Sequence, residues 1–398
     1  MYMTKLSSIA DYVTDKISSN DIALREYVTT DCILQNKKGR EIATNLPPQS
    51  CCLTRYQHGD VLIANIRPYL KKVWFADIDG GASSDVLVFR AKEGHSPSFL
   101  YAVLLQDSFF DYVMQGAKGS KMPRGDKEQI LRYEMPTLSC SEESIGTFFL
   151  NLDQKIRLNE QINQNLEAMA KQLYDYWFVQ FDFPNEEGKP YKSSGGEMVW
   201  NEKLKRKIPN EWDNCKLKDF INLFDSKRIP LSSKDREERK GNYPYYGATG
   251  IMDYVNEYIF DGDYILLAED GSTSDSKGFP IVQYIWGKNW VNNHAHIILP
   301  KNEQYLMFTY QMLRSIPAKQ IETGSIQKKI SQENLCEYNM VLPNSILIEK
   351  YESIISPLWE KRKLCIEEIN ALIKQRDELL PLLMNGQASV NSDLSNGL

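Results

Sequence analysis

Residues 59–64 read Gly-Asp-Val-Leu-Ile-Ala, and residues 262–268 read Gly-Asp-Tyr-Ile-Leu-Leu-Ala. The first stretch therefore recurs 203 positions later. A second landmark, Gly119-Ser120, recurs 205 positions later as Gly324-Ser325. A period of this length is far too long for a solenoid repeat. The sequence predicts one unit used twice, and each unit is a globular lobe followed by a long helix.

The helical part of each unit has apolar residues spaced alternately by four and three positions. This spacing matches coiled-coil heptads better than the wider face of an ordinary globular helix. The pattern recurs after 206 positions, so that Leu166 corresponds to Leu372. The predicted helix–helix seam consists of Phe149, Leu152, Ile156, Asn159, Asn163, Leu166, Leu173, Trp177, Ile355, Leu358, Ile369, Leu372, Leu379 and Leu383.

A helix over 145–180 would reach about 50 Å at ~1.5 Å per residue, which exceeds the width of a small lobe. Its own repeat is the cheapest partner, because an intramolecular pair avoids the entropy of association. We therefore expect an antiparallel helix pair that acts as a spacer. The polar seam positions, including Arg362 and Arg376, would fix its register. The alternative is a pair of ordinary bundle helices with a few solvated polar positions.

Both lobes contain short β-like runs bounded by Gly and Asp and followed by a helical stretch. The predicted fold class is α+β, with two α/β lobes in pseudo-twofold tandem, separated by two long helices that form an antiparallel coiled coil. The expected boundaries are 1–144 for the first lobe, 145–180 for the central helix, 181–197 for a turn-rich linker, 198–344 for the second lobe, 345–386 for the C-terminal helix and 387–398 for a flexible tail.

The composition indicates a folded chain of two to three domains, since its 398 residues are 42% hydrophobic. No signal peptide and no apolar run near ~18 residues is evident, so a cytoplasmic protein without membrane contact is expected. The seven cysteines lack CxxC spacing, which favours reduced thiols over zinc or redox chemistry. The net charge of −6 falls mainly on the helical segments, which favours protein contact there and permits a basic face on each lobe.

A glycine- and lysine-containing loop follows the helical stretch of each lobe, at 116–125 and at 323–329. Glycine lets backbone N–H groups approach an anion, and lysine or arginine neutralises phosphate. A solvated loop is the better interpretation of one such motif, and its recurrence at the repeat offset makes the functional interpretation equally strong. The candidate DNA-binding residues, including aromatic and basic neighbours, are Arg67, Tyr69, Lys118, Gly119, Ser120, Lys121, Arg124, Arg228, Tyr245, Tyr246, Thr323, Gly324, Ser325, Gln327, Lys328 and Lys329.

Motifs for catalysis are missing from the sequence. There is neither a P-loop pattern nor the Asn/Asp-Pro-Pro-aromatic segment of DNA amino-methyltransferases. His294 and His296 lack a third metal ligand nearby in the sequence, and Asp182 with Glu187 and Lys189 falls in the linker. We therefore expect no catalytic residue and no metal site, and we expect other chains to supply the chemistry.

Several segments together carry a family resemblance: 59–63, 117–126, 243–251, 269–271, 290–295 and 378–386. Over essentially its whole length the chain resembles the specificity subunit of type I restriction–modification enzymes. The resemblance implies a non-catalytic subunit in which each lobe reads one half of a bipartite double-stranded DNA sequence. It also implies two modification (methyltransferase) subunits docked on the helices, and restriction/translocase subunits that cut unmethylated DNA in phage defence. S-adenosylmethionine, ATP and Mg²⁺ would then be bound by those partners.

Two other classes of protein stay open from the residues alone. One is a coiled-coil adaptor or scaffold without DNA specificity, which the net negative charge favours. The other is a stand-alone DNA nuclease or methyltransferase. Within the family resemblance the second loop departs from the first, because Ile326 stands where the first loop has Lys121.

Overall fold

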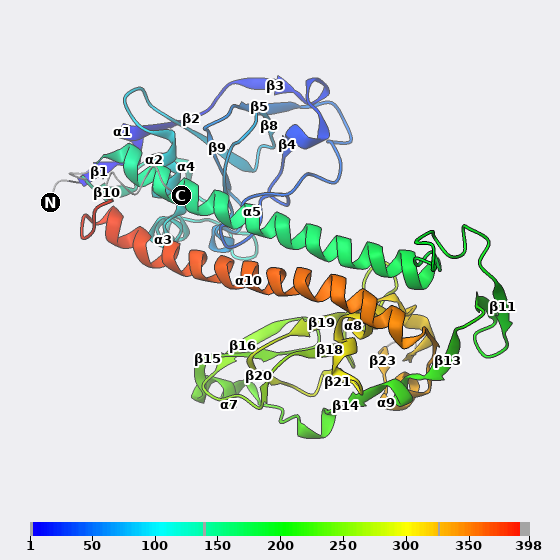
Figure 1. The fold of residues 1–398 in the computed structure, drawn as a ribbon. Coiled ribbons are helices and arrows are strands. Elements are labelled where there is room, and N and C mark those ends of the chain that lie inside the picture. Colours follow the sequence, from blue (N-terminus) through cyan, green and yellow to red (C-terminus); the bar gives the residue numbers. More distant parts are fainter. Residues whose placement is uncertain (1–2, 138–140, 325–326, 391–398) are drawn as a thin grey trace. The chain divides into compact units, whose positions relative to one another are not determined.

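A computed structural model describes residues 3–137, 141–324 and 327–390. The chain divides into two compact units. The first unit contains Met1–Gln161 and Cys365–Leu398, and the second contains Ile162–Leu364. Each unit thus holds one lobe and part of each long helix, α5 (Glu142–Tyr174) and α10 (Ser345–Met384) (Figure 1). The six segment boundaries given above stay a prediction.

The first lobe is built on two four-stranded sheets. The inner sheet has the order β2 (Ala10–Tyr12), β9 (Val86–Ala91), β6 (Val61–Ala64), β7 (Val73–Phe75), and all its neighbours are antiparallel. The outer sheet has the order β3 (Lys16–Ser18), β5 (Cys52–Tyr56), β8 (Gly80–Ala82), β4 (Tyr27–Val28). A separate pair joins β1 (Met3–Lys5) to β10 (Glu134–Pro136). The helices are α1 (Leu6–Ile9), α2 (Pro97–Leu105), α3 (Asp107–Gln115) and α4 (Lys127–Ile130).

The second lobe repeats this plan strand by strand. Its inner sheet has the order β14 (Ile221–Leu223), β21 (Ala295–Pro300), β18 (Tyr264–Ala268), β19 (Val282–Ile285). Here too a pair formed by β13 (Asp213–Lys216) and β24 (Asn339–Leu342) stands apart. The register also agrees, since Val61 pairs with Phe89 and Ile265 pairs with Ile298. The duplication predicted from the sequence offset therefore extends to individual strand pairs.

The outer sheets share three strands and differ in the fourth. In the second lobe the order is β16 (Ile251–Val255), β15 (Lys240–Tyr246), β20 (Lys288–Val291), β17 (Phe260–Asp261). Strands β17, β20 and β15 correspond to β5, β8 and β4, because each set contains one antiparallel pair followed by one parallel pair. The extra strand lies at the β5 edge in the first lobe and at the β15 edge in the second. The lobes therefore differ at their sheet edges while keeping one core.

The remaining elements of the second unit are short. Two hairpins pair β11 (Met198–Asn201) with β12 (Arg206–Pro209) and β22 (Glu322–Thr323) with β23 (Lys329–Ile330). The helices are α6 (Leu217–Phe220), α7 (Ser233–Glu238), α8 (Leu306–Ser315) and α9 (Gln332–Glu337). Among the described residues, no helix combines the length and apolarity needed to cross a membrane.

The two long helices pack against each other in antiparallel fashion within each unit. In the first unit, Asn159 donates to Glu368 at 2.8 Å, and the buried Arg376 lies 3.3 Å from Asp153. In the second unit, Arg362 lies 3.2 Å from Glu167. Three of the four polar residues expected at the seam therefore have defined partners across the helix pair. The Asn163 amide oxygen is buried without a hydrogen-bond partner in the described structure.

The apolar face of each helix is wider than the predicted seam. Seam residues such as Phe149 and Ile355 are fully buried, whereas Leu166 and Ile369 are half-buried. Aromatic residues outside the seam are buried as well, among them Tyr174, Phe178, Tyr351 and Trp359. The reason is that each half-helix packs both on its partner helix and on the core of its lobe. The α+β class with two paired helices is confirmed, and the helices also form part of both lobe cores.

The segment predicted as a linker is folded against the second unit. Phe181 and Phe183 belong to its core, and the Phe183 ring stacks on Trp212 at 5.0 Å. Asp182 accepts hydrogen bonds from the backbone and hydroxyl of Ser193, both at 2.7 Å. Polar turn residues in this segment therefore close a short loop onto the lobe.

Candidate nucleic-acid interface

The loop of the first lobe is held in a tight hairpin beside the end of β6. Lys118 and Arg124 exchange two backbone hydrogen bonds of 2.9 Å, and the Arg67 amide donates to Pro123 at 2.8 Å. Gly119 has φ of +98°, a left-handed conformation that favours glycine. The chain thus folds back on itself and presents residues 118–122 and Arg124 to solvent, while Pro123 is buried.

Basic side chains surround this loop on its exposed side. Lys118 pairs with Asp126 and Arg124 pairs with Asp85, each at 3.0 Å and with the cation largely exposed. Such exposed pairs contribute about 0–1 kcal/mol each, so a DNA phosphate can replace the carboxylate. Lys121 is exposed and has no ion pair in the described part of the chain. These cations can therefore neutralise a phosphate backbone without a large loss of stability.

Arg67 and Tyr69 lie on the short turn beside this loop, and both are exposed. Arg67 has φ of +53°, which is uncommon for a residue with a side chain. Its conformation is fixed by the bond from its amide to Pro123. The predicted residues of the first lobe therefore gather in one exposed region next to the end of β6.

The loop of the second lobe has the same construction. Thr323 and Lys329 pair across β22 and β23, and Gly324 has φ of +88°. The Thr323 hydroxyl donates to the Lys329 carbonyl at 3.3 Å. Lys328 lies 3.0 Å from Glu322, and half of its side chain is exposed. Ser325 lies outside the described residues, while Gln327 is exposed.

The two loops occupy one position of the repeated fold. Arg124 forms an isolated β-bridge with Ile66, directly after β6, and Lys329 forms one with Asp270, directly after β18. The loops therefore adjoin the C-terminal end of the same interior strand of the inner sheet, β6 in one lobe and β18 in the other. Their neighbours differ in charge, because Asn65 of the first lobe corresponds to Glu269 of the second.

Three aromatic and basic candidates lie away from the exposed surface. Tyr245 is 1% exposed, and its hydroxyl accepts a hydrogen bond from the Leu231 amide at 3.0 Å. Tyr246 is half-buried, and burial raises the pKa of its phenol to about 12. Arg228 is bound by Glu269 at 2.7 Å and by the Ala295 carbonyl at 2.8 Å. In this structure these side chains stabilise the lobe and offer little surface to DNA.

A buried ionic cluster, which the sequence did not indicate, lies beneath the second loop. Its acidic members are Asp225 and Glu269, and its other members are His296, Arg228 and Lys329. Burial alone would raise the pKa values of the two carboxyls. The hydrogen bonds and cations around them together have a larger effect, so both pKa values lie below their usual values. Both carboxylates are therefore charged at neutral pH.

Ligand atoms of Asp225, Glu269 and His296 lie within 4.8 Å of one another, a grouping that could hold a metal ion. The donor atoms are already engaged, however. The Asp225 carboxylate is hydrogen-bonded to His296, to the Gln332 side chain and to the Ile297 amide. The Glu269 carboxylate forms ion pairs with Arg228 and Lys329. A metal ion would have to displace these cations and donors, so the arrangement fits an internal salt-bridge cluster. His294 instead binds Asp270 at 2.6 Å near the surface.

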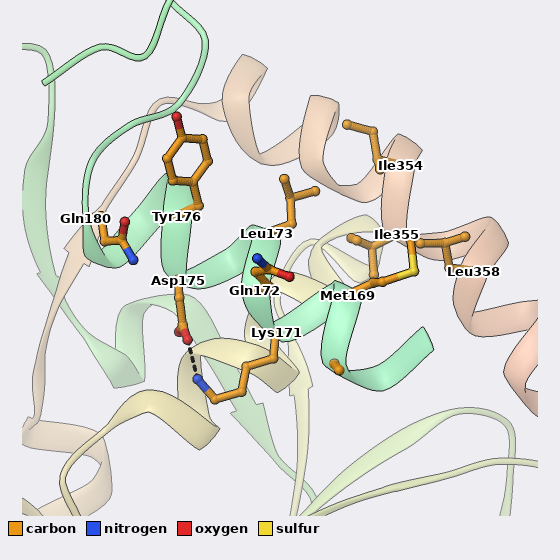
Figure 2. Close-up of a pocket in the computed structure, with 11 residues that line it drawn as sticks. Met169, Lys171, Gln172, Leu173, Asp175, Tyr176, Gln180, Ile354, Ile355 and Leu358 are labelled. Carbon is orange, nitrogen blue, oxygen red and sulfur yellow. Dashed lines mark hydrogen bonds and ion pairs between the residues drawn. The ribbon is translucent and has the colours of Figure 1, made fainter. Parts of the chain in front are cut away.

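The helix pair of the second unit carries an apolar groove of about 800 Å³ (Figure 2). Its walls come from the end of α5 and the start of α10. Met169, Tyr176 and Ile354 are exposed large apolar side chains in this groove, with Leu173 and Leu358 beside them. A contiguous apolar surface on a helix pair is typical of a protein contact site.

The comparisons with known proteins agree with this architecture. Residues 209–369 match the profile of the family described as type I restriction modification DNA specificity domain. The chain is 23% identical to the type I restriction enzyme MjaIX specificity subunit of Methanocaldococcus jannaschii, over 94% of this chain and 86% of that protein. It is 22% identical to the type I restriction enzyme HindI specificity subunit of Haemophilus influenzae, over 96% and 98% of the two chains.

Among solved structures, the crystal structure of a type I restriction–modification S subunit from M. genitalium has the same fold. It superposes with a TM-score of 0.61 at 16% identity and covers 96% of each chain.

Proposed function

Because the chain belongs to the family of type I restriction–modification specificity subunits, we propose that each lobe reads one half of a bipartite target in duplex DNA. The chain is the DNA specificity component of such an enzyme and is itself non-catalytic. The observation that carries the bipartite reading is the pair of equivalent loops. They adjoin the C-terminal ends of the equivalent strands β6 and β18 but are surrounded by different polar residues, as two different half-sites require.

The loops supply the contacts that position DNA. In the first lobe these are Arg67, Lys118, Lys121 and Arg124, with Tyr69 near base edges or sugars. In the second lobe the cations are Lys328 and Lys329, with Gln327 beside them. Phosphate contacts fix the register of the protein on the duplex, and side chains that reach the groove select the sequence. Tyr245 and Arg228 support the second lobe from inside.

The groove between α5 and α10 is the docking site for one modification subunit. The corresponding positions of the first unit, lower or higher by 206, are Phe148, Leu152, Gln375, Leu379 and Leu382, of which all but Gln375 are large and apolar and Leu152 is buried. The recurrence of apolar residue types at four of these five positions supports a complex with two modification subunits. We expect Ile354→Glu to lower the ratio of modification subunit to this chain from two to one. An unchanged ratio of two, measured by light scattering, would contradict this assignment.

The cofactors of the reaction belong to the partners. S-adenosylmethionine would be bound by the modification subunits, and ATP with Mg²⁺ by restriction/translocase subunits, in the cytoplasm where the DNA lies. The helices then act as a spacer whose length sets the number of unread base pairs between the half-sites.

Detection of methylated adenines across the genome, in cells with and without this chain, tests the proposal. We expect one bipartite motif, with two short specified halves and a fixed spacer, that disappears when the gene is deleted. A methylation pattern that does not depend on the chain would refute the proposal and favour the adaptor. Turnover of DNA by the purified chain alone, with Mg²⁺ and S-adenosylmethionine, would instead favour a stand-alone enzyme.

A further inference from the structure

The ionic cluster beneath the second loop joins three parts of the lobe that are distant in the sequence. Asp225 follows β14, Glu269 follows β18, and His296 lies within β21. His296 is fully buried, with Nδ1 2.6 Å from an Asp225 carboxylate oxygen and Nε2 2.8 Å from the carbonyl oxygen of Ile330 in β23. The imidazole therefore connects the inner sheet directly to the second strand of the loop hairpin.

Both partners of His296 are hydrogen-bond acceptors. The cluster joins the His296 imidazole, the Arg228 guanidinium and the Lys329 ammonium to two carboxylates. Charge-assisted hydrogen bonds in a water-poor interior are about twice as strong as neutral ones. The attachment of the loop to the sheet is therefore both strong and directional.

The loop is bound on its other side as well. The Ile330 amide donates to the Glu269 carbonyl at 2.8 Å, and the Gln332 side chain donates to Asp225 at 2.6 Å. The Glu269 carboxylate holds the half-exposed Lys329 ammonium at 3.1 Å. The Glu269 backbone and the His296 ring, which the Asp225 carboxylate holds, thus fix the backbone of β23. The Glu269 carboxylate fixes the direction of a loop cation.

In the first lobe the loop is attached to the inner sheet without a buried ionic cluster. Ala64 pairs with Val86 and Ala268 pairs with Ala295, so Leu87 occupies the position of His296. By the same register Thr14 occupies the position of Asp225, since the amides of Val13 and Phe224 make equivalent strand bonds. The only side-chain ion pair of Arg124 in the described structure is the exposed one with Asp85. The cluster is therefore an addition of the second lobe and is not required by the shared fold.

We propose that Asp225, Glu269 and His296 are positioning residues that clamp the second loop, so that Lys328 and Lys329 meet the DNA backbone in a fixed geometry. This inference rests on the proposed DNA-reading function and assigns a role to residues that do not touch DNA. A fixed loop loses less conformational entropy on binding, so the clamp raises affinity without adding a contact.

The decisive variant combines Asp225→Thr with His296→Leu. It gives the second lobe the residue types that the first lobe carries at these positions. It removes a carboxylate and leaves every lysine and arginine in place, so a loss of DNA binding reflects the lost clamp and not a lost attraction. The second variant, Glu269→Gln, places an amide where the first lobe has Asn65 and releases Lys329.

The assay is fluorescence anisotropy of the assembled methyltransferase complex on a labelled duplex that carries the motif found by methylation sequencing. We expect both variants to bind about tenfold more weakly. We also expect the slope of log affinity against log salt to fall in magnitude by about 1–2, because each lost phosphate contact removes ~0.9 from it. A loss of stability alone would not change this slope.

The two variants separate positioning from simple charge competition. If Glu269 merely competed with phosphate for Lys329, Glu269→Gln would bind DNA more tightly than the wild type, and this outcome would overturn the proposal. Should the double variant fail to fold, as judged by its melting curve, Glu269→Gln decides the question. Glu352→Gln serves as a matched control, since it replaces a buried carboxyl of the same unit, on α10, away from the loop.

Wild-type affinity and salt slope in both folded variants would also overturn the clamp while leaving the DNA-reading function intact. No preference of the wild-type complex for the motif duplex would refute the proposed function, and the clamp with it.

Discussion

Glu352 on α10 predicts a pH dependence of stability that a single substitution should remove. Its side chain is buried, with one carboxylate oxygen accepting from the Phe308 amide in the first turn of α8 at 2.7 Å. The other accepts from the Ser356 hydroxyl at 3.1 Å. Burial raises the pKa of this carboxyl from 4.5 to about 7, although the hydrogen bonds from Phe308 and Ser356 oppose the rise. The folded protein therefore binds a proton here that the unfolded chain releases near pH 4.5.

The sign and size of the effect follow from this difference. Because the folded state binds more protons than the unfolded state between pH 4.5 and pH 7, stability falls as the pH rises through this window. A difference of about 2.5 pKa units at ~1.4 kcal/mol each corresponds to about 3 kcal/mol. Glutamine keeps an oxygen for the Phe308 amide and an N–H₂ group for Ser356, but it does not ionise.

We therefore expect Glu352→Gln to be more stable than the wild type by less than about 1 kcal/mol at pH 5 and by up to about 3 kcal/mol at pH 8. Urea unfolding at both pH values, followed by circular dichroism, measures the free energy of unfolding. Comparing the change between the two pH values cancels the other titrating groups. Glu349→Gln is the matched control, because this exposed carboxylate lies one turn away on the same helix. Equal pH dependence of Glu352→Gln and the wild type would refute the reasoning.

Three further predictions concern the helices. Arg376→Ala should destabilise the first unit by about 3–5 kcal/mol, because it leaves Asp153 buried without its cation; urea unfolding with a cost below 1 kcal/mol would contradict this. Gly386→Ala should cost about 1 kcal/mol, since φ there is +67°, and an unchanged melting temperature would speak against it. Inserting one heptad after Gln161 and another after Leu364 lengthens each long helix by ~10 Å, so the unread spacer of the methylated motif should grow by about three base pairs. A spacer of unchanged length would contradict the idea that helix length sets it.

The duplication was predictable because it is written directly into the chain as offsets of 203 to 206 positions. Offsets locate equivalent elements even where composition changes, and the paired strands of the two inner sheets bear this out. Even the helix ends agree. The Asp182 amide donates to Tyr176 and the Gln387 amide donates to Leu382, both at 2.9 Å. The residue before each donor has positive φ, and it is Phe181 in one copy and Gly386 in the other.

The width of the helix faces was not predictable from the heptad pattern. A seam assumes one partner, whereas each half-helix here contacts both the other helix and a lobe core. Tyr351 illustrates the difference. It lies outside the predicted seam, but it is fully buried and its hydroxyl donates to the Ala170 carbonyl at 3.1 Å. Aromatic residues flanking a heptad pattern are the signal that would have indicated a second contact face.

The ionic cluster was not predictable for a different reason. Asp225 and His296 are 71 positions apart and meet only because β14 and β21 are neighbours in the sheet, so no local spacing marks them. Comparing the two copies provides the missing signal. Once the strand register is known, a buried histidine opposite an aliphatic residue of the other copy, His296 against Leu87, identifies a place where the lobes differ in chemistry.

This comparison separates what the two lobes need in common from what each needs alone. Some equivalent residues are apolar in both copies and lie in the core of their own lobe, where they support the sheet. Examples are Val61 with Ile265 and Phe89 with Ile298. Differences gather beside the loops and at the outer sheet edges, where a change does not disturb the core. With half-sites read at these loops, as we propose, each lobe could change its target without loss of the sheet that holds them. The buried clamp of the second lobe shows that the support of a loop, as well as the loop itself, can differ between lobes.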